Sequence, residues 1–384
     1  MDKSKKKTII FLVAIVVVLA VALGLYLGVP TAKTYVDYDF MGGISLQTII
    51  KANIVNQGPI GDKIYAAVSE VDKLTNPTKE TSDISKINNA SFGKKNAVTV
   101  SPTTIELLKI AYDVYVKTEG KFNPASYTLV DIWGFSANKF NKNAEHTVPE
   151  QALIDKGIAL SKKFEKIRFV ERYEEDVTGA TFVVNTVSNT VYKTEDCFVG
   201  GESAKIDLGG IAKGYAVEKC YDVFKNSVAD NGLVNLGGNV YTYNKDWKVG
   251  LENPFKYNKD ESGIIGVASV NNQSISCSGV YERNYKIGDK LYHHIIDTST
   301  GAPCEITGKS IVMAIVIGKN GAVSDAVATS LVLFKTIESA EEFVNKNYAD
   351  EISGVILINN AREYKVLGET SFAFNEEVKN FTKL

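Results

Sequence analysis

The stretch Lys205–Cys220, KIDLGGIAKGYAVEKC, contains a candidate ligand-binding turn in front of a predicted helix. Two glycines, Gly209 and Gly210, follow the single aspartate Asp207 and stand directly before an amphipathic run. Glycines at the start of a helix allow a ligand to lie against bare backbone, and the helix N-terminus attracts anions such as phosphate. A tight strand-to-helix turn without a ligand uses the same residues. The stretch therefore predicts either a site for a phosphorylated ligand or a plain turn.

The segments around this stretch alternate between helical and strand-like patterns. Apolar residues recur with helical spacing, or follow helix-start signals, at 60–74, 102–118, 149–164, 212–228 and 322–334. Short apolar runs between these segments predict strands, with a strand pair near 32–54 and hairpins over 166–199. Helices interspersed with antiparallel-looking strands indicate an α+β fold rather than a regular βαβ array. We therefore expect one α+β domain of mixed, largely antiparallel sheets with packed helices.

The N-terminus predicts a membrane anchor. Residues 1–7 contain four lysines, and Thr8–Val29 is an uncharged apolar run of 22 residues. This length fits a bilayer-spanning helix, and the lysines favour a cytoplasmic N-terminus. The alternative is a long cleavable signal peptide, which also sends the remainder across the membrane. We expect a cytoplasmic basic tail at 1–7, a single-pass cell-membrane anchor at 8–29 and an extracytoplasmic domain at 35–384.

Composition narrows the class of partner. The 43 basic and 45 acidic residues leave no charge excess that would favour nucleic acid, so a small ligand or a protein is the expected partner. The four cysteines are far apart and lack CxxC spacing, which leaves both disulfides and buried free thiols open. With only three histidines in the chain, we assign no zinc site.

The run SDAVATS contains a candidate pair of metal ligands. Asp325 and Thr329 are four residues apart, so on a helix both side chains share one face. A carboxylate and a hydroxyl are hard oxygen donors that suit Mg²⁺, an ion that fills its shell with waters and substrate phosphates. Alternatively, Asp325 caps the helix and Thr329 bonds back to its own backbone.

Two further motifs contain candidate binding or catalytic side chains. In YHHIIDTSTG, His293 and His294 are adjacent, so on a strand only one of them faces a given cleft. Histidine is well suited to accept a proton near neutral pH, and a hydrogen-bonded structural histidine is the alternative. The aromatic-rich run FNPASYTLVDIWGF, which includes Trp133, is expected to be core rather than the wall of a flat ligand.

Nine motifs in this order resemble the ApbE family of FAD:protein FMN transferases, between about Asp39 and Phe334. They are MGG, SDISKINN, FNPASYTLVDIWGF, KIDLGGIAKGYAVE, LVNLGGNV, WKVGLENP, SCSGVYER, YHHIIDTSTG and SDAVATSL. The resemblance implies Mg²⁺-dependent cleavage of FAD, transfer of FMN through its phosphate to a threonine or serine hydroxyl, and release of AMP. The acceptor would be an exported or membrane-bound redox protein with an Asp-Gly-x-Ser/Thr-Gly/Ser-Ala-Thr-like sequence.

The resemblance also assigns roles to individual residues. It makes Asp325 and Thr329 side-chain ligands of Mg²⁺, the backbone carbonyl of Gly210 a third ligand, and His294 the base. The positions that fall where the family contacts FAD are Met41, Ile87, Asn88, Asp207 and Lys213. Two alternatives use the same site: a hydrolase that splits FAD to FMN and AMP, and a module that binds flavin without chemistry.

Several residues depart from the usual motifs of the family. They are Gly43 in place of Thr, Asn123 in place of Asp, Asn239 in place of Asp and Thr298 in place of Pro. None of them removes a proposed metal ligand or the base, so we expect them to alter the flavin pocket and the choice of acceptor. The run TGAT ending at Thr181 resembles the family's acceptor sequence, which makes self-modification a hypothesis to test.

Overall fold

The computed structural model describes residues 15–19, 24, 28–172, 175–255 and 262–384. The predicted anchor at 8–29 therefore lies mostly outside the described residues, as does the whole predicted tail at 1–7. Within the part that is described, no helix is both long and apolar enough to cross a membrane. Strand pairing starts at Pro30, which pairs with Asn53, so the folded domain begins before the expected boundary at 35.

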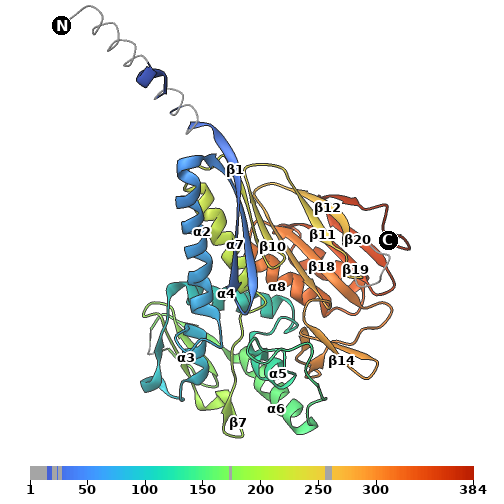
Figure 1. Ribbon diagram of the computed structural model, residues 1–384. Helices are drawn as coiled ribbons and strands as arrows, with labels where there is room; N and C mark the ends of the chain where they lie inside the picture. The colour runs from blue at the N-terminus through green and yellow to red at the C-terminus, as the bar shows by residue number, and fades with distance from the viewer. Residues whose placement is uncertain (1–14, 20–23, 25–27, 173–174, 256–261) are drawn as a thin grey trace, which may run out of the picture.

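A large, mainly antiparallel sheet forms the centre of the molecule (Figure 1). In the described residues it has nine strands in the order β1-β2-β9-β10-β13-β18-β19-β20-β22, with only the β20–β22 pair parallel. The strands are β1 (Pro30–Phe40), β2 (Ile44–Asn53), β9 (Asn231–Leu236), β10 (Asn239–Tyr243), β13 (Ser274–Gly279), β18 (Ile311–Gly318), β19 (Ile352–Asn359), β20 (Glu363–Gly368) and β22 (Thr382–Lys383). The expected strand pair near 32–54 is thus confirmed as β1 and β2.

Smaller sheets and hairpins surround the large one. β11 (Trp247–Glu252), β12 (Ile264–Val270) and β21 (Ser371–Phe374) form one sheet, and β3 (Val98–Thr99), β6 (Thr190–Lys193), β5 (Phe182–Asn185) and β4 (Arg168–Val170) form another. Three hairpins are β7 (Phe198–Val199) with β8 (Glu202–Ser203), β14 (Asn284–Ile287) with β15 (Lys290–His293), and β16 (Ile296–Asp297) with β17 (Ala302–Pro303). β4 and β5 are parallel, so the expectation of hairpins over 166–199 is only partly correct.

Helices pack on the large sheet and on one another. They are α2 (Ile54–Thr75), α3 (Asp83–Asn89), α4 (Pro102–Lys117), α5 (Tyr127–Ile132), α6 (Gln151–Ser161), α7 (Ala212–Lys225), α8 (Gly321–Val332) and α9 (Ile337–Asn347). α7 packs against both α2 and α8, and α8 lies on β13 and β18. Since α8 is apolar almost all round, it suits the buried position that it occupies.

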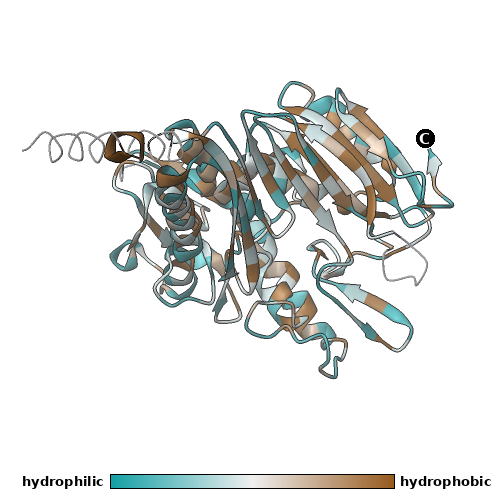
Figure 2. Cartoon of the chain, turned by 45° about the horizontal axis from the view of Figure 1, so that its top comes forward, coloured by the Kyte–Doolittle hydropathy of each residue, from teal (hydrophilic) through white to brown (hydrophobic). Residues whose placement is uncertain are grey.

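The core follows the central strands. Every residue of β18 is buried, so this strand is covered on both faces, and Figure 2 shows apolar residues along the central strands. This arrangement positions the site, because α7 packs on β10 and β13 and α8 packs on β13. The polar residues of α8 are therefore held against the sheet within the core, where their positions are fixed by packing.

Candidate active site

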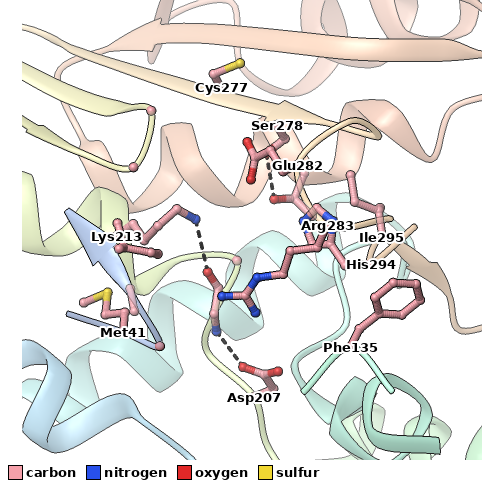
Figure 3. Close-up of a pocket in the computed structure, with 18 of the residues that line it drawn as sticks. Met41, Phe135, Asp207, Lys213, Cys277, Ser278, Glu282, Arg283, His294 and Ile295 are labelled. Atoms are coloured by element: carbon pink, nitrogen blue, oxygen red, sulfur yellow. Dashed lines mark hydrogen bonds between the residues drawn. The ribbon is translucent and has the colours of Figure 1, made fainter. Parts of the chain in front are cut away.

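A cavity of about 890 Å³ opens where several elements end. Its walls include the turn after β1, the glycine loop before α7, one face of α8 and the base of the β14–β15 hairpin. This volume lies within the range of cofactor-binding clefts. Six of the residues singled out in the sequence line it: Met41, Asp207, Gly210, Lys213, His294 and Thr329. Segments that are far apart in the sequence thus meet at one site (Figure 3).

The glycine loop is held from both sides by hydrogen bonds. The backbone N–H of Asp207 donates to the carbonyl of Pro124 at 2.7 Å, and the Asp207 Oδ1 accepts from the Gly209 N–H at 2.7 Å. A Cβ on Gly210 would lie 3.1 Å from the Phe122 ring and 3.5 Å from the Thr329 hydroxyl. The bare backbone of Gly210 therefore approaches Thr329 closely, as the metal assignment requires. Burial raises the pKa of Asp207, although the Gly209 N–H and nearby cations oppose this effect.

Ile87 and Asn88 do not line the cavity, because both side chains are buried on α3. The Asn88 amide donates to the Ile206 carbonyl at 2.8 Å, and its oxygen accepts from the Ile206 N–H at 2.7 Å. The buried ammonium of Lys193 in turn donates to the Asn88 carbonyl at 2.9 Å. Asn88 thus fixes the backbone next to Asp207, and contact of either residue with FAD stays a prediction.

Asp325 lies behind the cavity at the crossing of α7 and α8. Its Oδ2 accepts from the Gly214 N–H, a donor in the first turn of α7, at 2.9 Å. Its Oδ1 is buried without a hydrogen-bond partner, and the Lys213 ammonium faces it at 3.6 Å. A buried carboxylate oxygen without a donor is costly unless a cation compensates it. This position therefore suits a metal ion.

Thr329 and a row of serines on β13 continue this polar layer. The Thr329 hydroxyl lies 3.1 Å from the Ser278 hydroxyl, and Ser274 bonds Ser324 at 3.1 Å. Between them on the same strand face, the Ser276 hydroxyl is buried with no partner. Thr329 also bonds back to the Asp325 carbonyl at 3.2 Å, which is the alternative expected from the sequence.

These residues fit Mg²⁺ by their donor chemistry. Asp325, Thr329 and the Gly210 backbone are oxygen donors that the α7–α8 crossing brings together. In the described residues no group of three or more His, Cys, Asp or Glu side chains could hold a metal. A set with one carboxylate, one hydroxyl and one carbonyl is not such a group, and Mg²⁺ commonly uses few protein ligands.

The two adjacent histidines face different surroundings, as the strand pattern predicts. His293 is fully buried, and its Nε2 lies 3.0 Å from the Cys304 carbonyl. His294 lines the cavity, its backbone N–H donates to the Arg283 carbonyl at 3.0 Å, and its Nδ1 has no hydrogen-bond partner. Burial lowers the pKa of His294 to about 3, with His293, Arg283 and Lys213 adding to the effect. His294 is therefore neutral near pH 7, and in these surroundings its ring is a weak base.

Five charged residues of the cavity were not singled out in the sequence: Asp72, Lys121, Glu252, Glu282 and Arg283. Burial raises the pKa of Glu282 to about 7, with Asp325 and Glu252 adding to the effect and Lys213 and Arg283 opposing it. The available signal was the adjacent pair Glu282 and Arg283 at the end of the motif SCSGVYER.

The motif departures have local structural counterparts. The Asn123 amide donates to the Thr298 hydroxyl at 3.3 Å, so these two departures contact each other at the cavity wall. Gly43 has φ +95°, a conformation that glycine adopts without strain. The Asn239 side chain is buried with neither polar atom bonded.

The remaining expectations concern the aromatic run, the cysteines and Thr181. Trp133 is buried and donates to the Gly301 carbonyl at 2.8 Å, so it is core as expected. Phe122, Tyr127 and Phe135 of the same run line the cavity, so the expectation that the whole run is core is only partly correct. All four cysteines are free, which resolves that alternative in favour of thiols. Thr181 is fully buried and donates to the Lys163 carbonyl at 2.5 Å, so its hydroxyl is inaccessible to a reaction in the folded state.

Fold and cavity together define a class: an α+β protein with a deep site that suits a phosphorylated ligand and one hard metal ion. Comparison with known proteins then places the chain within that class. The model of the ApbE family matches residues 44–354. The chain belongs to the ApbE family.

Individual relatives agree with this placement. An FAD:protein FMN transferase of Klebsiella pneumoniae is 28% identical over 248 residues, which cover 64% of this chain and 67% of the relative. One from Rhodobacter capsulatus is 27% identical, and the match spans 40% of its length. The crystal structure of an ApbE protein from Thermotoga maritima has a TM-score of 0.67 at 21% identity, covering 90% of this chain and 97% of that one. The flavin transferase ApbE from Vibrio cholerae has a TM-score of 0.66 at 20% identity, covering 92% and 99%.

Proposed function

We propose that this protein is an Mg²⁺-dependent FAD:protein FMN transferase. The observation that supports the proposal most directly is the shared cavity of Asp207, Gly210, His294 and Thr329, with the orphaned Asp325 oxygen behind it. The curated relatives named above are transferases of this kind. A neutral histidine and a pair of oxygen ligands facing one cavity are the groups that phosphoryl transfer to a hydroxyl needs.

The proposed reaction moves one phosphoryl centre. The oxygen of an acceptor threonine or serine attacks the FMN-side phosphorus of FAD, and the hydroxyl proton passes to His294. The bond between this phosphorus and the bridging oxygen breaks, and AMP leaves with that oxygen and its electron pair. Asp207 and Lys213 hold FAD in the cavity, while the glycine loop gives the diphosphate room beside the backbone.

Asp325, Thr329 and the Gly210 carbonyl are the residues that would hold Mg²⁺. The ion would neutralise charge that develops on the diphosphate oxygens during the transfer. We assign the base role to His294 because it lines the cavity and its ring is neutral at working pH. Since its pKa lies near 3, the negative charge of the bound diphosphate has to raise that pKa before the ring can hold the proton.

We further propose that the enzyme is a single-pass protein of the cell membrane whose domain from 35 to 384 lies outside the cytoplasm. The lysines of residues 1–7 and the uncharged run Thr8–Val29 support this orientation. The acceptor would be an exported or membrane-bound redox protein with an Asp-Gly-x-Ser/Thr-Gly/Ser-Ala-Thr-like sequence.

Incubation of the full chain with FAD, Mg²⁺ and a domain that contains such a sequence tests the proposal. We expect flavin fluorescence on the denatured acceptor and one AMP released per label. A matched acceptor with valine in place of the final threonine is expected to stay unlabelled. Free FMN and AMP in equal amounts without a labelled acceptor would instead support the hydrolase, and the absence of AMP release would contradict both activities.

A further inference from the structure

Arg283 is a cation of the cavity to which neither the sequence motifs nor the family resemblance gave a role. It stands between Glu282 and the start of β14, and its carbonyl accepts the His294 N–H at 3.0 Å. Arg283 and His294 are therefore the two ends of one hairpin, joined at its base. This pairing fixes the backbone from which the Arg283 side chain starts.

Stacked aromatic rings anchor this hairpin to the wall of the cavity. Tyr285 stacks on Phe135 with ring centres 4.8 Å apart, and its hydroxyl donates to the Trp133 carbonyl at 2.7 Å. On the second strand, Tyr292 stacks on Trp133 at 5.3 Å. Both strands are thus packed against a rigid core, so Arg283 is presented from a preorganised position.

The Arg283 side chain enters the cavity beside bare backbone. A Cβ on Gly42 would lie 3.6 Å from the Arg283 Nη2 and only 2.9 Å from the Ala137 Cβ. Figure 3 shows the guanidinium extending from the hairpin base toward Asp207, with Lys213 on the other side of the cavity. Gly42 thus leaves room for the guanidinium at the point where the turn after β1 lies against Ala137.

Among the described residues, the carboxylates of Asp207 and Glu282 act on the charge of Arg283 without forming an ion pair with it. Among the described residues, no side chain makes a hydrogen bond or an ion pair with its guanidinium. Lys213, by contrast, faces Asp325 at 3.6 Å and donates to the Gly209 carbonyl at 3.4 Å. The positive charge of Arg283 acts on the pKa values of Asp207, Glu282 and His294. Arg283 therefore lies within electrostatic reach of groups from three segments.

We propose that the Arg283 guanidinium binds phosphate oxygens of the dinucleotide and stabilises the charge that forms on them during transfer. Guanidinium is planar and always charged, and its paired N–H donors match two oxygens of a phosphate. A fixed cation in a cavity stabilises developing charge without reorganising at the moment of reaction. This inference rests on the proposed function, since it assumes that a flavin dinucleotide occupies the cavity.

Binding of a ligand panel to the full chain separates phosphate contact from contact with the flavin ring. The panel is FAD, ADP and riboflavin, compared for the wild type, Arg283→Met, Arg283→Lys and the control Lys286→Met. Lys286 is an exposed cation on β14 of the same hairpin and is not among the residues that line the cavity. We expect Arg283→Met to weaken FAD and ADP on the order of 10-fold or more and to leave riboflavin unchanged. Arg283→Lys is expected to be intermediate, and the control to match the wild type.

Turnover gives the second measurement. We expect AMP release at saturating FAD to fall on the order of 100-fold in Arg283→Met. Equal losses for riboflavin and ADP would overturn the inference in favour of a ring contact or a folding defect, and unfolding curves of both variants separate these two. A rise in the KM for the acceptor alone would also overturn it. If the wild type binds the panel but labels no acceptor, the proposed function fails while the phosphate contact is still measured.

Discussion

The crossing of α7 and α8 gives the sharpest prediction about this site. Gly214 and Gly321 face each other there, and a Cβ on Gly214 would lie 2.0 Å from the Gly321 carbonyl oxygen and 2.6 Å from the Asp325 Cβ. Gly214→Ala therefore forces the two helices apart. Restoring the 3.4 Å at which ordinary contact begins requires a shift of about 1.4 Å from the present 2.0 Å.

The shift has a structural and a chemical cost. Overpacking of a dense core costs about 1–3 kcal/mol, and stretching the 2.9 Å bond from the Gly214 N–H to Asp325 removes roughly 1.5–3 kcal/mol more. The gain in helix propensity from glycine to alanine returns about 1 kcal/mol. We expect a net loss of about 3 kcal/mol, or a fall in Tm of about 6 °C at roughly 2 °C per kcal/mol. The same shift moves Asp325 relative to the Gly210 loop.

Thermal unfolding and AMP release measure the two consequences separately. Gly61→Ala is the matched control, because Gly61 also lies in a helix interior but its Cβ would meet only ordinary contacts at 3.7 Å. We expect the control to be neutral or slightly stabilised and fully active. A Gly214→Ala protein that keeps both the Tm and the turnover of the wild type would refute the close crossing and the position of Asp325 that depends on it.

Three further predictions follow from other parts of the structure. Asp325→Asn keeps an acceptor for the Gly214 N–H but removes the charge, so AMP release should fall on the order of 100-fold with little change in Tm; normal turnover in Mg²⁺ would disprove the metal assignment. Burial lowers the pKa of His293 to about 4 in the folded protein, whereas the pKa of a histidine in the unfolded chain is near 6.5. Between these two pH values, His293 binds a proton in the unfolded chain but not in the folded protein. The contribution of His293 to the free energy of unfolding in urea should therefore drop by about 2 kcal/mol from pH 7 to pH 5. The difference between the wild type and His293→Gln measures this contribution, because His294 and Glu282 titrate in the same way in both proteins. Intact mass after incubation with FAD and Mg²⁺ should show no FMN group on the enzyme, because Thr181 is buried, and a gain of one FMN that Thr181→Val abolishes would contradict this.

Elements with strong periodicity were predictable from the sequence, and breaks in pattern were misleading. The helix expected at 102–118 is α4, Pro102–Lys117, because Ser101 caps it and proline occupies its first turn. The helix expected from 60 begins at Ile54, although Gly58 and Pro59 read as a stop. Pro59 leaves the Val55 carbonyl without its helical donor, and Val55 is 56% exposed, so water can replace that bond.

The residues of the candidate site also fall into those that local sequence could predict and those that depend on the tertiary fold. Local spacing was sufficient to place Asp325 and Thr329 on one helix and to predict that the two histidines have different surroundings. No local pattern indicated that Asn88 would bind the backbone at Ile206, 118 positions away. Arg283 and Glu282 were also missed, because only the closure of the hairpin onto the aromatic wall brings these charges into the cavity.

With the proposed membrane anchor, β1 would set the distance between the bilayer and the cavity. Its 11 residues, each adding about 3.3 Å, extend over roughly 36 Å from the end of the proposed anchor to the Met41 turn. Because β1 is hydrogen-bonded to β2 along its length, it is a rigid spacer and not a flexible linker. Only acceptor hydroxyls at about that distance from the bilayer would then reach the cavity. This would restrict labelling to partners whose acceptor sequence lies at the same distance from the membrane.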